Sequence, residues 1–212
     1  PAAFTLAAAG SMANGIYQSA NLFGTGERAS TDLSSFTKWS DMFARFQSEA
    51  NNPNATDIVN EWHRDLEPLR GQSLTEMAAG VNRIMNRVEY IGDNRNWGKS
   101  DYWETPIEFL TRGGDCEDFA IAKYTSLRAL GVSDVSMRIA IVKDMQKGIP
   151  HAILIVYTEN GPMVLDNQIK TMTRARDISH YKPIFSINRT AWWIHTDRPS
   201  YASPTQIASA SR

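Results

Sequence analysis

The spacing of hydrophobic positions changes once along this chain of 212 residues. In the first half, apolar residues recur every three or four positions, as at Trp39, Met42 and Phe46, which predicts amphipathic helices with one buried face. After Gly131 the period shortens toward two, and residues 152–157 are apolar throughout, as in a central strand buried on both faces. Helices followed by a meander of strands predict an α+β fold with a segregated antiparallel sheet.

Cap and turn residues set the boundaries of the expected elements. Ser73 and Glu76 have the spacing of a capping box, and Thr105 followed by Pro106 matches an N-cap with proline at the first helical position. Helices are expected to begin near residues 35, 56, 74, 106 and 116, and a polar loop is expected over residues 92–100. The expected strands cover residues 135–143, 151–157, 163–166, 183–188 and 191–195.

The composition fits one globular domain. Hydrophobic residues make up 42% of the chain and charged residues 21%, and the net charge of -1 gives no electrostatic reason to expect nucleic acid as a partner. No apolar run approaches the length of a transmembrane segment. The first residues have no charged region of the kind that opens an intact signal peptide, which leaves export open. We expect a domain over residues 31–200, a flexible N-terminal segment over residues 1–30 and a flexible tail over residues 201–212.

The single cysteine of the sequence lies where a predicted helix begins. Gly113 and Gly114 let the backbone turn sharply before Cys116. At a helix N-terminus, free N–H groups and the macrodipole favour the thiolate, and cysteines so placed have pKa values of roughly 3.5 to 7.5. His151 opens one strand-like run, and Asp166 ends the next. This chain order is that of papain-like and transglutaminase-like hydrolases.

Three acids crowd the cysteine: Asp115, Glu117 and Asp118. Like charges disfavour the thiolate, and a bound hard cation such as calcium, which prefers oxygen ligands, would remove that penalty. A simpler interpretation also fits, in which Asp115 is an N-cap and the other two acids stabilise the first turn. Since calcium takes about six to eight oxygens, backbone carbonyls, water or the polar stretch at residues 93–96 would have to complete the site.

The turn after residue 158 gives a geometric test of the histidine and aspartate pair. If residues 160–161 formed an ideal two-residue turn, Asp166 would pair with Ile155, roughly 13 Å from His151 and out of hydrogen-bonding range. A connection centred nearer residues 158–159, or a bulge near residues 161–162, would bring the two residues level, so we predict an irregular turn here. Otherwise Asn167 is the nearest substitute, because an amide can also orient an imidazole.

The residues around the cysteine resemble the bacterial transglutaminase-like cysteine proteinases. The resemblance covers roughly residues 31–196 and is strongest over residues 101–110 and 113–131, with further matches at 149–152 and 164–167. It implies a papain/transglutaminase-like fold in which N-terminal helices pack on an antiparallel β-sheet and the nucleophile lies at a helix N-terminus. It maps the family's catalytic triad onto Cys116, His151 and Asp166.

The resemblance also carries expectations about cofactor, substrate and partners. It implies Ca²⁺ binding by the acids beside the cysteine, Asp115 and Glu117, with Asp118 as a third candidate. It implies a periplasmic endopeptidase that cleaves a large adhesin near its N-terminal region at a di-alanine site and so promotes biofilm dispersal. The implied regulatory partner is an inner-membrane cyclic-di-GMP receptor that sequesters the protease.

The expected reaction is amide hydrolysis through a thioester. His151 accepts the Cys116 proton, Asp166 orients the imidazole, and the Cys116 backbone N–H binds the oxyanion, with the indole of Trp97 or Trp103 as a second donor. Two alternatives remain, a transglutaminase-type acyl transferase and a non-catalytic calcium-binding interaction module of the same fold. The remaining histidines are expected to be structural: His63, His180 and His195.

Overall fold

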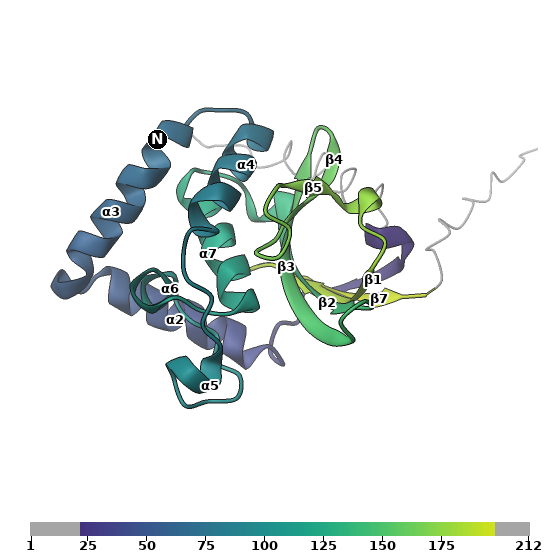
Figure 1. The fold of residues 1–212 in the computed structure, drawn as a ribbon, viewed down its shortest axis with the longest axis horizontal. Helices are drawn as coiled ribbons and strands as arrows, with labels where there is room; N and C mark the ends of the chain where they lie inside the picture. The colour runs from purple at the N-terminus through teal and green to yellow at the C-terminus, as the bar shows by residue number, and fades with distance from the viewer. Residues whose placement is uncertain (1–21, 198–212) are drawn as a thin grey trace, which may run out of the picture.

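A computed structural model of the chain describes residues 22–197. In Figure 1 the helices lie together on one side of the molecule and the strands on the other. The α-helices are α2 (Thr37–Ala50), α3 (Thr56–Leu66), α4 (Leu74–Met85), α5 (Asp93–Asn96), α6 (Pro106–Arg112) and α7 (Cys116–Ala129). The strands are β1 (Gly26–Ser30), β2 (Met137–Asp144), β3 (Ile149–Thr158), β4 (Gly161–Leu165), β5 (Thr173–Arg174), β6 (Tyr181–Ile187) and β7 (Trp192–Thr196). Short 3₁₀ turns are η1 (Leu22–Gly24), η2 (Pro53–Ala55), η3 (Glu67–Leu69), η4 (Asp134–Ser136) and η5 (Ala175–Asp177).

Two of the expected helix starts, those of α4 and α6, are confirmed by capping hydrogen bonds. At the start of α4, the Ser73 N–H donates to the Glu76 carboxylate (3.0 Å) and the Glu76 N–H donates to the Ser73 hydroxyl (3.3 Å). The same reciprocal pair opens α6, where the Thr105 N–H donates to Glu108 (2.7 Å) and the Glu108 N–H donates back to the Thr105 hydroxyl (3.1 Å). Each box satisfies backbone donors that have no partner within the helix.

The described strands form one seven-stranded sheet in the order β1-β7-β6-β2-β3-β4-β5. All neighbouring strands in it are antiparallel. The middle of β3 is buried on both faces, as its continuous apolar run predicts. These features confirm the α+β fold, with helices packed on an antiparallel sheet.

Helix α7 joins the two parts of the molecule. It packs against α4 and α6 on one side and against β3 and β2 on the other, and Figure 1 shows it between the remaining helices and the sheet. Residues 118–127 of α7 are all buried, because the helix has neighbours on every side. This packing brings Cys116, the first residue of α7, to the sheet.

The prediction of a flexible N-terminal segment over residues 1–30 is wrong for residues 22–30. These residues form η1 and β1, and β1 pairs with β7 from Gly26 opposite Thr196 to Ser30 opposite Trp192. β1 is short and polar, and at the edge of the sheet it has only one partner strand. Its sequence therefore has little hydrophobic periodicity from which a strand could be predicted. Residues 1–21 and the expected tail over residues 201–212 lie outside the described residues.

The expected polar loop over residues 92–100 also contains a short helix, α5, because the Gly92 carbonyl accepts hydrogen bonds from Arg95 (2.9 Å) and Asn96 (3.1 Å).

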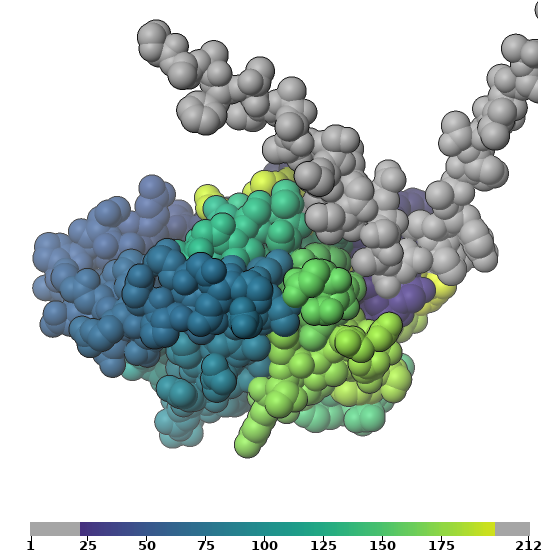
Figure 2. All heavy atoms as spheres, turned by 90° about the horizontal axis from the view of Figure 1, so that it is seen from above, coloured from purple at the N-terminus to yellow at the C-terminus, as the bar shows by residue number. Residues whose placement is uncertain are grey.

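The view in Figure 2 shows the helical part and the strands packed directly against each other on that face of the molecule. Within residues 22–197, no helix has both the length and the apolar character needed to cross a bilayer.

Candidate active site

Two glycines shape the backbone that leads into Cys116. Gly113 ends α6 with φ of 81°, and a Cβ there would lie 2.5 Å from the Glu89 carbonyl oxygen. A Cβ on Gly114 would lie 2.6 Å from Oδ2 of Asp118. Both contacts are far closer than a side chain tolerates, so glycine is required at these two positions. The sharp turn between α6 and α7 places the thiol at the first residue of its helix.

The thiol of Cys116 lies in a partly buried and negatively charged environment. Burial, followed by the charge of Glu117, raises the pKa of Cys116 above its usual range. The thiol donates a hydrogen bond to Oε2 of Glu117 (3.1 Å). The backbone N–H of Ala152, next to His151 on β3, acts in the opposite direction and stabilises the thiolate. Burial and the neighbouring acids therefore hold the thiol protonated in this arrangement.

The structure brings His151 and Asp166 together inside the sheet. Nε2 of His151 lies 2.9 Å from Oδ1 of Asp166, and both side chains are buried. Asp166 also accepts hydrogen bonds from the Tyr181 hydroxyl (2.7 Å) and the Gln168 backbone N–H (2.9 Å). Burial would raise the pKa of Asp166, but the hydrogen bond and charge of His151, together with Tyr181, lower it. Asp166 is thus an ionised acceptor, so Nε2 of His151 carries the hydrogen.

The prediction of an irregular turn between β3 and β4 is wrong. Thr158 pairs with Gly161, so residues 159–160 form a two-residue turn without a register shift. The turn lies one position earlier than an Asn-Gly turn would, and continuing the register places Asp166 opposite Ile153. His151 is two residues further along β3 on the same face, a diagonal separation of about 7–8 Å that two side chains can span.

The second ring nitrogen of His151 faces the side chain of Gln168. The Gln168 amide nitrogen lies 3.1 Å from Nδ1, and its amide oxygen accepts a hydrogen bond from Lys147. Because Lys147 can only donate, the amide nitrogen of Gln168 is the donor toward Nδ1. Nδ1 is therefore an unprotonated acceptor, which is the state a general base requires.

Cys116 and His151 line the same cleft, which has a volume of about 310 Å³. The described residues show no hydrogen bond between them, because the thiol donates to Glu117 and Nδ1 faces Gln168. The other lining residues are Asp101, Trp103, Glu117, Ile141, Pro150, Ala152 and Phe185. The walls are mostly apolar, and the two reactive groups lie where α7 meets β3.

Acidic side chains from three segments meet beside the cysteine. Asp93 at the start of α5 and the exposed Asp101 have carboxylate oxygens within 4.8 Å of one another and of Glu117. Asp115 and Glu117 form another such group with the cysteine sulfur. The third group combines Asp93 with the buried acids Glu104 and Asp118. Asp93 belongs to the stretch expected to complete a metal site, whereas Asp101 and Glu104 were not expected, although both precede the cysteine motif in the region of strongest resemblance.

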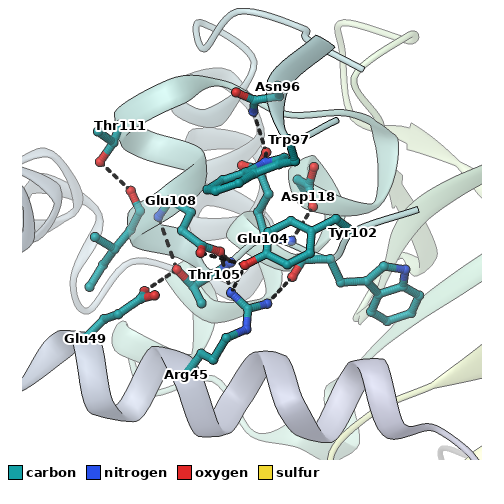
Figure 3. Close-up of polar contacts among 12 residues, drawn as sticks. Arg45, Glu49, Asn96, Trp97, Tyr102, Glu104, Thr105, Glu108, Thr111 and Asp118 are labelled. Atoms are coloured by element: carbon teal, nitrogen blue, oxygen red, sulfur yellow. Dashed lines mark hydrogen bonds and ion pairs between the residues drawn. The ribbon is translucent and has the colours of Figure 1, made fainter. Parts of the chain in front are cut away.

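A hydrogen-bond network holds the segment that carries these acids (Figure 3). Oε1 of Glu104 accepts hydrogen bonds from Asn96 (2.6 Å) and the Trp97 indole (2.5 Å). Asp118 accepts from the backbone N–H groups of Glu104 (2.8 Å) and Asp115 (2.9 Å), so both of its oxygens have backbone partners. Asp118 thereby joins the segment to the start of α7.

The same segment is fixed to α2 from the other side. Arg45 pairs with Glu108 at 2.6 Å and donates to the Trp103 carbonyl oxygen at 2.5 Å, as drawn in Figure 3. The Tyr102 hydroxyl donates to Glu108 (2.8 Å), and the Tyr102 backbone N–H donates to Asp93 (2.5 Å). These contacts hold Trp103 at the cleft and Asp93 beside Glu117.

These acids fit a divalent cation because several of their carboxylate oxygens are buried without a hydrogen-bond partner among the described residues. Oδ1 of Asp93, Oδ1 of Asp115 and Oε2 of Glu104 are buried and have no hydrogen-bond partner among the described residues. Burial and neighbouring carboxylates raise the pKa of Asp115 to about 8 and that of Glu104 to about 7. Buried anionic oxygens without donors are unfavourable, and a cation would remove the penalty. The donor set consists of carboxylates, which suit a hard ion such as calcium.

Other expected residues have different surroundings. The Trp97 indole donates to Glu104, so it is not free to serve as an oxyanion donor, whereas Trp103 lines the cleft. Asn167 is not placed at the imidazole, because Asp166 occupies that position. The remaining histidines lie outside the cleft: His63 on α3, His180 before β6 and His195 on β7. Tyr181 and Gln168, which contact the pair, were not predicted, and a lone tyrosine or glutamine in a sequence carries no signal of such a role.

Comparisons with known proteins identify relatives in sequence and fold. A family model of the bacterial transglutaminase-like cysteine proteinases matches residues 36–199. Calcium-bound LapG from Legionella pneumophila is 28% identical, with 73% of this chain and 86% of that chain covered and a TM-score of 0.59. An EGTA-treated structure of the same protein gives 28% identity, 73% and 84% coverage and a TM-score of 0.59. A search of curated proteins finds no match.

Proposed function

Because the chain belongs to the family of bacterial transglutaminase-like cysteine proteinases, we propose that it is a calcium-dependent cysteine endopeptidase with a Cys116, His151 and Asp166 triad. The observation that carries this proposal is the buried hydrogen bond of 2.9 Å between His151 and Asp166. His151 lies on β3, beside the only cysteine of the sequence. Similarity to LapG at 28% identity supports the same assignment. A non-catalytic calcium-binding module or a purely structural role would not require an imidazole held in one tautomer beside a thiol.

The proposed reaction uses the geometry of the cleft. Asp166 accepts a hydrogen bond from the Nε2–H group of His151, which leaves Nδ1 free of a proton. Nδ1 takes the proton of Cys116 as the Cys116 sulfur attacks the scissile carbonyl. The Gln168 amide must move away from Nδ1 for that transfer to occur. The Cys116 backbone N–H at the start of α7 stabilises the oxyanion, and His151 then returns its proton to the leaving amine. Water hydrolyses the thioester and restores the thiol.

The residues that would hold calcium are Asp115 and Glu117 with Asp93 and Asp101. Asp118 and Glu104 form the adjoining group. The bound cation would supply positive charge that offsets the carboxylates around the thiol. The calcium-bound and EGTA-treated LapG structures support calcium as the metal. Without a cation, Glu117 accepts the thiol hydrogen bond, which opposes formation of the thiolate.

The lining of the cleft supports a peptide substrate with apolar residues at the cut. Trp103, Ile141 and Phe185 provide an apolar surface in a cavity of about 310 Å³. We propose a di-alanine site near the N-terminal region of a large cell-surface adhesin, whose release promotes biofilm dispersal. The family resemblance further supports a periplasmic location and an inner-membrane cyclic-di-GMP receptor as the sequestering partner.

The test is cleavage of a fluorogenic peptide that contains a central Ala-Ala, with calcium or with EGTA. We expect the wild type to cleave in calcium, and Cys116→Ala and His151→Gln to be inactive while keeping the wild-type melting temperature. A parallel assay with a fluorescent amine detects acyl transfer in place of hydrolysis. Cleavage by Cys116→Ala would refute the nucleophile, activity in EGTA would refute calcium dependence, and amine incorporation at the expense of hydrolysis would favour a transglutaminase.

A further inference from the structure

Another pocket, larger than the catalytic cleft, opens on the inner face of the curved sheet. Its volume is about 650 Å³, compared with about 310 Å³ for the cleft that holds Cys116. In Figure 1 the sheet curls, so that β4 and β5 at one end lie across from β1 and β7 at the other. The turns η1 and η5 pack against each other inside this curve. The pocket is lined by residues of η1, the β3–β4 turn, β5, η5 and β6.

The pocket lies on the same face of the sheet as the catalytic pair. Its lining residues Ile178 and Tyr181 belong to an apolar cluster that also contains Ile153 of β3. Because side chains alternate along a strand, His151 leaves β3 on the same face as Ile153, and Asp166 continues the register opposite Ile153. Helix α7 packs on the opposite face. The histidine and aspartate pair and the pocket therefore share the inner face of the sheet.

Tyr181 belongs both to the wall of the pocket and to the surroundings of the pair. Its hydroxyl donates to Oδ2 of Asp166 (2.7 Å), and its ring centroid lies 5.6 Å from that of His151. Phe23, another lining residue, packs edge-on against the Tyr181 ring at 6.3 Å. A molecule in the pocket would thus touch a residue that contacts both members of the pair.

The charge of the pocket is positive. Among its described lining residues, Arg174 and Arg176 are charged and none is acidic. Arg176 lies 3.8 Å from Asp177, but both side chains are exposed, so this ion pair is weak. The Arg174 side chain forms no ion pair or hydrogen bond with another described residue. Guanidinium groups bind phosphate through paired N–H donors, so two of them in one pocket favour a phosphate group.

The size and the remaining walls of the pocket suit a small molecule. Sites for small molecules typically have volumes of about 300–1,000 Å³, with mostly apolar walls and a few polar groups that fix the orientation of the ligand. Here Phe23, Pro162 and Ile178 supply apolar surface, and Asn160 supplies a neutral polar side chain.

We propose that this pocket binds a small phosphate ester with an aromatic or other apolar part, and that the bound molecule acts on the catalytic pair through Tyr181. Arg174 and Arg176 hold the phosphate group, and the apolar wall holds the rest of the molecule. The site itself is independent of the proposed function. Its effect on catalysis rests on that function only in that Asp166 orients His151.

The test is a titration of the full chain with phenyl phosphate, followed by NMR of the backbone amides and of the His151 ring. We expect saturable shifts at the amides of Ile178 and Ser179 and at the His151 ring, whose signals are assigned with His151→Gln. Benzylamine, which carries a ring with the opposite charge, should produce none of these shifts. Benzoate, which has one carboxylate in place of the phosphate, should bind more weakly than phenyl phosphate.

The double variant Arg174→Gln/Arg176→Gln should weaken phenyl phosphate binding about tenfold or more, because it removes both charged donors. Both arginines are exposed, so the variant should keep the wild-type melting temperature. The matched control is Arg64→Gln/Arg83→Gln, which removes two exposed arginines of α3 and α4 and should bind like wild type.

Each other result contradicts a stated part of the inference. Absence of saturable shifts with phenyl phosphate, or equal binding by Arg174→Gln/Arg176→Gln and wild type, would overturn the site. Tighter binding of benzoate or benzylamine would overturn phosphate as the recognised group. Shifts at Ile178 without a change at His151 would overturn the link to the catalytic pair. Binding with all the expected shifts, in a protein that cleaves no peptide, would refute the proposed function and leave the phosphate site intact.

Discussion

Nε2 of His151 lies 2.9 Å from Oδ1 of Asp166, although Asp166 continues the strand register opposite Ile153 and not opposite His151. The hydrogen bond therefore runs diagonally between adjacent strands, on one face of the sheet. It is possible because β4 ends at Leu165, which frees Asp166 from the strand and lets its side chain lean toward the histidine. The Tyr181 hydroxyl (2.7 Å) then fixes the second carboxylate oxygen from β6.

This diagonal contact predicts different effects for two adjacent residues. Asp166→Ala should lower kcat about 10²–10⁴-fold, because the imidazole loses the acceptor that fixes its tautomer. Asn167→Ala should change kcat less than about threefold, since Asn167 does not contact the ring. Peptide cleavage under saturating substrate measures both. A larger loss in Asn167→Ala than in Asp166→Ala would transfer the orienting role to Asn167.

Gln168 predicts a change in thiol reactivity with a definite sign. Its amide nitrogen faces Nδ1 of His151 at 3.1 Å, which stabilises the neutral ring and opposes transfer of the Cys116 proton to it. Gln168→Ala should therefore increase the rate at which iodoacetamide alkylates Cys116, by about threefold or more at neutral pH. The control is Gln72→Ala, because Gln72 is an exposed glutamine far from Gln168 in the sequence. A slower alkylation in Gln168→Ala would mean that the amide assists the transfer.

Asp93 predicts the extent of the cation site beyond the cysteine motif. Asp93→Asn should weaken calcium binding about tenfold or more, because it removes an anionic ligand whose Oδ1 has no other partner among the described residues. Asp41→Asn, an exposed acid on α2 outside the three acidic groups, should leave the affinity unchanged. Isothermal titration calorimetry measures both, independently of activity. Equal affinities of Asp93→Asn and wild type would restrict the site to the acids next to Cys116.

We predict that the protein loses stability in mild acid because of the buried His195. Burial lowers its pKa to about 4, and its ring lies between the hydroxyls of Thr25 and Ser186, each at 3.0 Å. Since the unfolded chain binds this proton near pH 6.5 and the folded chain near pH 4, the free energy of unfolding should fall by up to about 1.4 kcal/mol per pH unit as the pH drops between these values. His195→Gln should reduce that fall. Urea unfolding at pH 7 and pH 4.5 measures it.

The exposed His63 supplies the control for this measurement. His63→Gln should keep the wild-type dependence of stability on pH, because the ring is exposed on α3. If His195→Gln and wild type lose the same free energy between pH 7 and pH 4.5, other groups account for the acid sensitivity.

The sequence by itself determined the features that depend on neighbours along the chain. The capping residues Ser73 and Thr105 fixed two helix starts, and the Gly-Gly pair before Cys116 indicated a thiol at a helix N-terminus. The α+β class followed from the change in hydrophobic period. The order of cysteine, histidine and aspartate indicated the chemistry, because these residue types perform it only in combination.

The tertiary structure alone decided which distant groups share a space. Asp93 and Asp101 join Glu117, and Tyr181 and Gln168 contact the histidine and aspartate pair. The edge strand β1 and the position of the β3–β4 turn also escaped prediction. Hydrophobic periodicity and capping report on residues a few positions apart, whereas register and side-chain proximity depend on how whole elements pack, which no local pattern encodes.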